Sequence, residues 1–136
     1  MNTGRFVGAA VAVWLVRTLL NSGFYGYLMR GEYERISERY PGAFREVVPA
    51  FITLDLLVAL LLVYLIVKAA SCFGGGMKGA VTIAIFVAIL GPIVFSLYYY
   101  FSTTYYTLNF FALESVYQLV SHAIQGAVAA AIYKSV

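Results

Sequence analysis

Apolar residues dominate four stretches of the chain, and short polar segments separate them. The stretches cover about residues 4–29, 49–70, 79–101 and 109–134. At about 1.5 Å per residue, each one is long enough as a helix to cross a hydrocarbon core of about 30 Å. The pattern predicts an all-α polytopic membrane protein with four transmembrane helices in an up-down antiparallel bundle, forming one membrane domain over residues 1–136.

The segment between the first two stretches, residues 30–48, is strongly polar and holds four Arg and four Glu. Tyr33, Ile36 and Tyr40 recur at helical spacing among these charges. This pattern indicates a short interfacial helix that ends at Pro41-Gly42. A solvated loop is the alternative interpretation.

A polar stripe runs along the last apolar stretch. Its members follow one another at spacings of four, four and three, which places them on one face of a helix: Glu114, Gln118, His122 and Gln125. Polar groups in a membrane segment are costly unless they meet other polar groups or water. We therefore expect this face to point into the bundle, a partner subunit or a cavity.

The first two stretches carry polar residues at similar depths. Arg17 lies in the middle of the first, followed by Asn21 and Tyr25, and Asp55 lies in the second. A central Arg costs about 2.5–3.5 kcal/mol on insertion scales, so a carboxylate partner, Asp55 or Glu114, or a water-filled cleft is expected.

Together these residues predict an intramembrane polar column of Arg17, Asn21, Asp55, Glu114, Gln118, His122 and Gln125. One interpretation is a structural ion pair of Arg17 supported by amide hydrogen bonds. The other is a proton or cation pathway, in which Asp55 and Glu114 hold exchangeable charge and His122 titrates near neutral pH.

Two local features bear on helix packing. Gly91-Pro92 lies near the centre of the third stretch, where proline should kink the helix, either for packing or to shape a cavity. Small residues gather near Gly8 in the first stretch and from Gly126 in the last, which permits close helix contact. Asn109 is a candidate cap for the last helix.

A tyrosine-rich connection precedes the last stretch. We expect its tyrosines to form an aromatic belt at the membrane interface, where rings stay in apolar surroundings and hydroxyls reach water. A stacking site for a pigment or quinone is the alternative. The members of the predicted belt are Tyr98, Tyr99, Tyr100, Tyr105 and Tyr106.

Composition supports a membrane protein and excludes several other classes. The chain is 62% hydrophobic and 11% charged, too little charge to cover a soluble domain of 136 residues. Its net charge of +3 forms no contiguous basic face, so nucleic-acid binding is not expected. Cys72 is the only cysteine, and no spacing suits a metal, a catalytic site or a cofactor. His122 is more simply a packing residue than a haem ligand.

The basic residues outside 30–48 indicate an orientation. Arg5, Lys68, Lys78 and Lys134 fall on the side of both termini, and the four Arg of residues 30–48 fall on the other side, so the count of basic residues is equal. Because four Glu neutralise residues 30–48, we expect cytoplasmic termini. The first residues look like a signal peptide, but apolar sequence resumes after Arg17, so we interpret them as part of the first span.

The run NSGFYGYLMRGEYE, the Gly-rich basic turn between the second and third spans and the closing QGAVAAAIYK together resemble a family of small, uncharacterised four-helix membrane proteins of bacteria. The resemblance covers most of the chain and implies a bacterial inner membrane, but no activity. In that family a Glu and a His often stand near the end of the first helix, where this chain has Asn21 and Tyr25.

The sequence favours a non-catalytic accessory or structural subunit of a membrane complex. Its expected partners are the lipid bilayer and other membrane subunits or a second copy of the chain. The alternative is a homo-oligomeric small transporter or channel for protons or cations that uses the polar column. A transport site would favour broken helices, and Gly91-Pro92 is the one candidate break.

Overall fold

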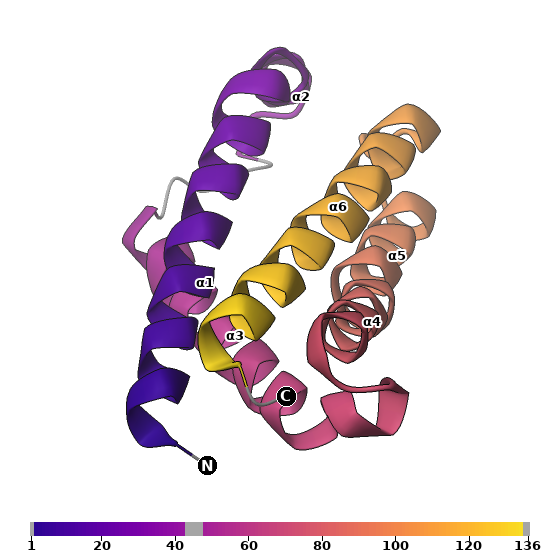
Figure 1. Ribbon diagram of the computed structural model, residues 1–136. Helices are drawn as coiled ribbons and strands as arrows, with labels where there is room; N and C mark the ends of the chain where they lie inside the picture. Colours follow the sequence, from indigo (N-terminus) through magenta and orange to yellow (C-terminus); the bar gives the residue numbers. More distant parts are fainter. Residues whose placement is uncertain (1, 43–47, 135–136) are drawn as a thin grey trace.

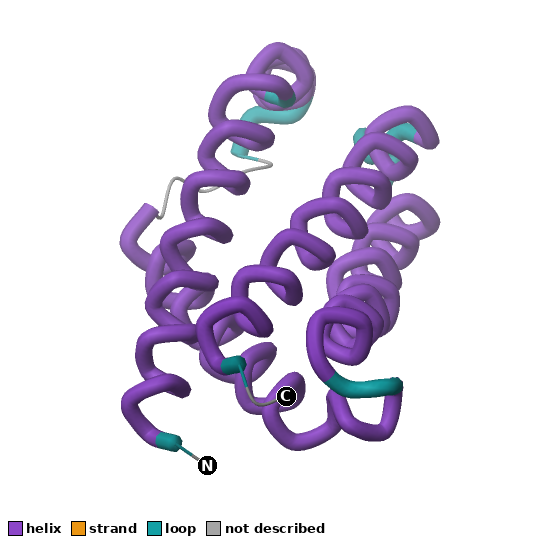
Figure 2. Tube along the Cα trace, viewed as in Figure 1, coloured by secondary structure: helices purple, strands orange, loops and turns teal. Residues whose placement is uncertain are grey.

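The computed structural model describes residues 2–42 and 48–134, and every regular element in these ranges is helical (Figures 1 and 2). The first part comprises α1 (Thr3–Gly23), the π-helical turn η1 (Phe24–Leu28) and α2 (Arg30–Arg39). The second part comprises α3 (Val48–Ala69), the 3₁₀ turn η2 (Ala70–Phe73), α4 (Gly76–Ala88), the π-helical turn η3 (Ile89–Ile93), α5 (Val94–Ser102) and α6 (Leu108–Tyr133).

Three continuous helical stretches are long and apolar enough to cross a membrane: Thr3–Leu28, Pro49–Phe73 and Gly76–Ser102. They fit a small membrane protein. The helix α6 has 26 residues but does not reach this hydropathy, so of the four predicted spans three are found among the described residues. The physical reason is the polar stripe of α6, because Gln118, His122 and Gln125 lower its hydropathy although other helices bury them to 6% exposure or less.

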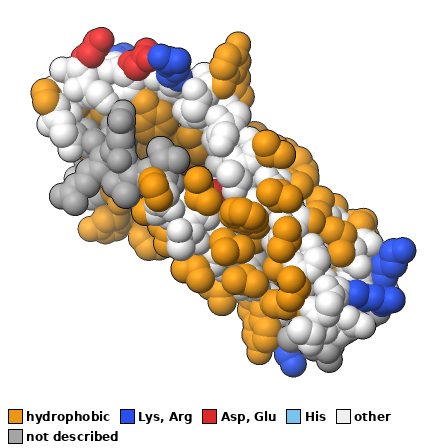
Figure 3. Space-filling model, turned by 90° about the vertical axis from the view of Figure 1, so that its left-hand side faces the viewer, with side chains coloured by type: hydrophobic (Ala, Val, Ile, Leu, Met, Phe, Trp, Pro, Cys, Tyr) orange, Lys and Arg blue, Asp and Glu red, His pale blue; other side chains and the backbone are white. Residues whose placement is uncertain are grey.

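Both described ends of the chain lie at the same end of the molecule, and the helices spread apart toward the other end, where α2 lies (Figure 1). The backbone N–H of Asn2 donates to the hydroxyl of Tyr133 over 3.2 Å, which joins the start of α1 to the end of α6. Viewed from the side, hydrophobic side chains dominate the middle of the surface and most charged side chains lie at its two ends, with a small acidic spot in a hollow between them (Figure 3). A bilayer imposes this distribution.

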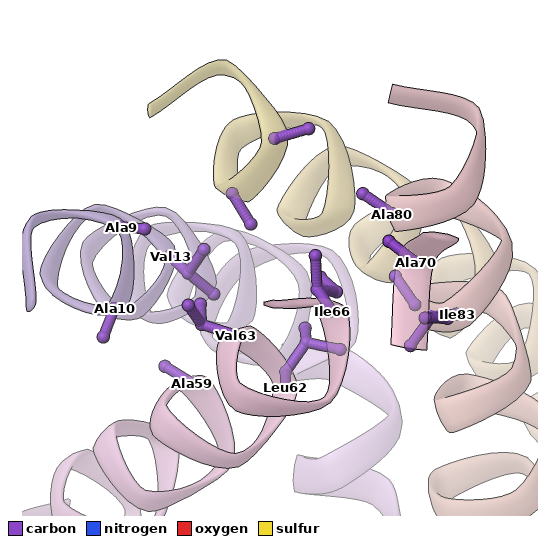
Figure 4. Close-up of a cluster of buried hydrophobic side chains, with 13 residues drawn as sticks. Ala9, Ala10, Val13, Ala59, Leu62, Val63, Ile66, Ala70, Ala80 and Ile83 are labelled. Carbon is purple, nitrogen blue, oxygen red and sulfur yellow. The ribbon is translucent and has the colours of Figure 1, made fainter. Parts of the chain in front are cut away.

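Small side chains form the core near the termini. Ala9 and Ala10 of α1 lie with Ala59 and Val63 of α3 (Figure 4), and the same cluster includes Ala129 of α6. The small residues predicted to permit close contact therefore do so. With little hydrophobic force between helices in lipid, such close approach supplies van der Waals contact instead.

The crossing of α4 and α6 is especially tight at Gly126. A Cβ atom added there would lie 2.9 Å from the carbonyl oxygen of Ala80 and from the Cβ atom of Ala84. Real Cβ atoms do not approach this closely, so glycine sets the distance between the two helices.

Larger aromatic side chains form a second cluster at the end away from the termini. Ile36 of α2 is 3% exposed and packs with Phe24, Met29 and Phe110. The helix predicted within residues 30–48 is confirmed for Arg30–Arg39, ahead of Pro41-Gly42, and its apolar face contacts protein. Residues 43–47 of the predicted segment lie outside the described residues.

The predicted cap of the last helix is wrong by two residues. The hydroxyl of Thr107 accepts a hydrogen bond from the backbone N–H of Phe110 at 3.2 Å, whereas Asn109 lies inside α6. A threonine with extended backbone suits a helix start because its side chain satisfies a free N–H group. Pro49 lies in the first turn of α3, where its missing N–H costs nothing.

Candidate functional site

Arg17 pairs with Asp55. The Nε atom of Arg17 lies 2.7 Å from Oδ1 of Asp55, and each side chain is 13% exposed. The side-chain amide of Asn21 donates to both oxygens of Asp55, at 3.0 and 3.1 Å, and Tyr117 donates to the oxygen of that amide. Of the two carboxylates that could neutralise Arg17, Asp55 does so. Hydrogen bonds from Asn21 and Tyr117 extend the ion pair into a network that links α1, α3 and α6.

Glu114 lies on α6 in a different environment. Three hydroxyl groups donate to its carboxylate: Tyr25 to Oε1 at 2.6 Å, Ser96 to Oε2 at 2.7 Å, and Tyr106 also to Oε2. Within the described part of the chain, Glu114 forms no ion pair. Hydroxyl donors orient a carboxylate and stabilise its charge, but they leave the net charge in place.

Two π-helical turns position two of these three donors, Tyr25 and Ser96. In the first, the N–H of Met29 donates to the carbonyl of Phe24 at 2.8 Å, and the turn carries Tyr25. In the second, the N–H of Val94 donates to the carbonyl of Ile89, and Ser96 follows two residues later. A π turn inserts an extra residue and rotates the side chains after it, and such turns are frequent at functional sites.

The break at Gly91-Pro92 was predicted, and the break at Phe24–Leu28 was missed. Pro92 has no N–H to donate within its helix, so the bonding pattern widens around it. The only signal for the earlier break is a pair of glycines, Gly23 and Gly26, in an otherwise helical pattern.

A cavity of about 410 Å³ lies beside Glu114. Phe51 at the start of α3 and Phe95 and Tyr99 on α5 line it and are themselves exposed, so the cavity reaches the surface between these helices. Aromatic side chains supply most of its wall. The complete lining is Tyr33, Phe51, Pro92, Phe95, Ser96, Tyr99, Tyr105, Tyr106, Phe110 and Glu114.

The aromatic wall is continuous around part of the cavity. The ring centroids of Tyr106 and Phe110 lie 4.6 Å apart, those of Tyr33 and Phe110 lie 5.7 Å apart, and those of Tyr99 and Tyr106 lie 6.3 Å apart. Burial raises the pKa of Tyr33 in α2, and the negative charge of Glu114 raises this pKa further. Tyr33 is therefore a neutral phenol at physiological pH.

The predicted column divides into parts. Gln118 joins the Glu114 site, because its side-chain amide donates to the hydroxyl of Tyr25 at 2.9 Å. His122 bonds within α6, its Nδ1 lying 2.9 Å from the carbonyl oxygen of Gln118, and since a carbonyl only accepts, Nδ1 carries the proton. Gln125 donates to Ser121 at 2.9 Å, one turn away on the same helix.

The tyrosines of the tyrosine-rich connection lie in different surroundings. Tyr99, Tyr105 and Tyr106 line the cavity, whereas Tyr98 and Tyr100 are not part of its lining. Sequence reasoning grouped all five in one interface belt, because composition alone does not tell which rings turn inward. Ser96 was missed entirely, and its only signal is a hydroxyl four residues after Pro92 in an apolar span.

The arrangement is suited to hold a positive charge. It combines one carboxylate without a cationic partner among the described residues, three hydroxyls and several aromatic faces, and both carboxylates and ring faces attract cations. Across the described ranges, no three His, Cys, Asp or Glu side chains come together to hold a metal ion. The chain matches no protein-family model, and searches of curated proteins and of solved structures found no match either.

Proposed function

We propose that this protein is a small membrane transporter that binds a proton or another cation at Glu114. The observation that carries this proposal is the state of the Glu114 carboxylate. Three hydroxyls orient it, it lines a cavity, and within the described residues no cation neutralises it. An ionisable side chain within a membrane bundle is costly, which makes a function its simplest explanation.

The proposal assigns exchangeable charge to Glu114 and not to Asp55. Hydrogen-bond donors reach both oxygens of each carboxylate, but Arg17 already neutralises Asp55 at 2.7 Å, so a further cation at Asp55 would have to displace that counter-charge. The polar column thus has a structural part at Arg17 and Asp55 and a binding part at Glu114.

The two π turns favour transport over a purely structural role. Binding sites of membrane transporters typically lie where spanning helices are interrupted. Here both interrupted helices supply groups to one site, Tyr25 from η1 and Ser96 after η3, and Pro92 lines the cavity. A cavity that opens to the surface between two helices suits a carrier that binds and releases its cargo.

The proposal includes an orientation in the bacterial inner membrane. With α6 as the fourth span, the start of α1 and the end of α6 share one side, as the bond between Asn2 and Tyr133 requires. Arg5 and Lys134 lie at that end, and Lys68 and Lys78 lie on either side of the turn between α3 and α4. The opposite side carries four Arg in residues 30–48, but four Glu neutralise them, which favours the cytoplasm for both termini.

Flux measurements on Glu114→Gln test the transport proposal. Purified protein is reconstituted in vesicles, and luminal pH and uptake of radioactive Na⁺, K⁺ or the organic cation benzyltrimethylammonium are followed under imposed gradients. We expect flux above protein-free vesicles for the wild-type protein and for Glu38→Gln, whose side chain is exposed on α2. Glu114→Gln should fall to the level of protein-free vesicles. Equal flux in Glu114→Gln and the wild-type protein, or none in the wild-type protein, would refute the proposal.

An accessory subunit is the second candidate. The observation that favours it is an exposed apolar strip on α6, where Leu113, Val116 and Val120 are 55%, 62% and 54% exposed. A partner helix would cover this strip. Extraction in mild detergent followed by mass determination decides between the two: a stoichiometric complex with other proteins supports the accessory role, and a defined homo-oligomer supports transport.

A further inference from the structure

We infer that the cavity beside Glu114 takes an amphiphilic organic cation, that is, a quaternary ammonium or a protonated amine attached to an apolar body. This inference rests on the proposed function and specifies the class of its cargo. It follows from the chemistry of the lining, the volume of the cavity and its position in the bundle.

The lining suits an organic cation better than an inorganic one. A small inorganic cation gives up its water shell only where several oxygen ligands replace it, and Ca²⁺, for example, takes about six to eight. Here one carboxylate and a few hydroxyls face a wall made mostly of carbon. An ammonium group that carries alkyl substituents has a weaker water shell, and it gains from the faces of Phe and Tyr rings as well as from the carboxylate.

The charge and the rings lie within reach of one ligand. Tyr106 donates to Glu114 through its hydroxyl, while its ring contacts those of Phe110 and Tyr99. The same aromatic wall that borders the carboxylate therefore extends along the cavity to Tyr99, which is 47% exposed. A ligand with its cationic group at Glu114 would place its apolar body along this wall.

The volume of the cavity is larger than a bare ion needs and favours an organic occupant. About 410 Å³ falls in the range of roughly 300–1,000 Å³ that is typical of pockets for small organic molecules. A cation bound at Glu114 alone would leave most of the space along the aromatic wall unused. A molecule with an apolar body fills it.

The position of the cavity offers a route for such a molecule. Tyr25 and Ser96 both lie in the last two turns of their spans, Thr3–Leu28 and Gly76–Ser102, which places Glu114 near one membrane interface. Amphiphilic molecules gather at this level, with the charge in the headgroups and the apolar part in the hydrocarbon. The exposed rings of Phe51 and Phe95 face that region at the mouth of the cavity.

Calorimetric titration with benzyltrimethylammonium tests the inference, with KCl as the inorganic comparison. We expect saturable binding to the wild-type protein in detergent and none of K⁺ over the same range. Glu114→Gln should weaken binding by about tenfold or more, because a charged partner is lost. Phe95→Leu should weaken it by about twofold to fivefold, the size of an exposed cation–π contact.

Phe101→Leu is the matched control for Phe95→Leu. Both residues are exposed on α5, at 77% and 66%, but only Phe95 lines the cavity, so Phe101→Leu should bind as the wild-type protein does. Because both side chains are exposed, neither change should affect folding. Equal weakening in the two variants, binding unaffected by Glu114→Gln, or no binding at all would overturn the inference.

The titration tests the class of ligand and the flux assay tests transport, so the two results distinguish the two claims. Flux that depends on Glu114 without binding of benzyltrimethylammonium would overturn the ligand class and leave the transport proposal standing. Binding that depends on Glu114 without flux of any tested cation, benzyltrimethylammonium included, would support the ligand class and overturn transport. Absence of both would overturn both.

Discussion

Replacing Arg17 by leucine should destabilise the protein by leaving the Asp55 carboxylate without its counter-charge. In the folded protein Asp55 receives the Arg17 guanidinium at 2.7 Å and the Asn21 amide at 3.0 and 3.1 Å. After Arg17→Leu only the amide remains, and the carboxylate keeps its negative charge. The change therefore removes more than one hydrogen bond, because it leaves a partly buried charge unpaired.

The magnitude follows from the burial of the pair. Removing one partner of a fully buried ion pair costs about 3–5 kcal/mol. Both side chains are 13% exposed, so the protein does not enclose the pair fully, and we expect a cost of about 2–3 kcal/mol for Arg17→Leu. Adding Asp55→Asn removes the unpaired charge and should restore about 1–2 kcal/mol, since an amide in the same place costs far less than a carboxylate.

The assay is reversible unfolding in mixed micelles by SDS, followed by circular dichroism, for the single and double variants. Glu114→Gln provides the matched comparison, because Glu114 is bonded to hydroxyls and not to Arg17. The combination of Arg17→Leu with Glu114→Gln should be additive within about 0.5 kcal/mol. If the combination of Arg17→Leu with Asp55→Asn is additive to the same degree, the ion pair does not stabilise the protein and the reasoning is refuted.

Three further predictions concern packing, capping and orientation. Gly126→Ala should destabilise the folded protein by about 1–3 kcal/mol, because the added Cβ atom would lie 2.9 Å from the backbone of α4. Gly23→Ala is the control and should not destabilise the protein, because a Cβ atom there has no neighbour within 4 Å. Equal effects of the two changes in SDS unfolding would contradict this prediction. Thr107→Ala should cost about 1 kcal/mol in the same assay through loss of the α6 cap, and no change would show the cap to be dispensable. With cytoplasmic termini, an impermeant maleimide should label the exposed Cys72 only after the cells are permeabilised. The same reagent should label Ser37→Cys, made in a Cys72→Ser background, in intact cells. The reverse pattern would show the opposite orientation.

The helices were largely predictable, because the mean hydropathy of a long stretch indicates whether lipid or water surrounds it. Thr3–Leu28, Pro49–Phe73 and Gly76–Ser102 match three of the predicted spans to within a few residues. The fourth stretch is the helix α6, but its polar stripe leaves it below the hydropathy of a span on its own. Only the tertiary structure shows that its neighbours bury this stripe.

The site was predictable as a set of residues and not as an arrangement. Helical spacing placed Glu114 on a stripe, but spacing within one helix does not say which side chain of another helix reaches it. Arg17 therefore had two candidate partners in the sequence, and the structure decides for Asp55. The donors Tyr25 and Ser96 depend on π turns, whose extra residue shifts every later side chain in a way that a regular helical period does not anticipate.

The pair of Arg17 and Asp55 also bears on how the chain enters the membrane during synthesis. The two charges lie on α1 and α3, which precede the other two long apolar stretches in the chain, and each is the costliest residue of its helix. When the second span appears, the two can neutralise each other and enter lipid as a hairpin without net charge at its centre. The hydrogen bonds of Glu114 form later, because their donors come from the first span, the third span and the connection before α6. Membrane insertion can thus be completed for α1 and α3 before the surroundings of Glu114 form, and these are assembled only when α6, which follows the other helices in the chain, is made.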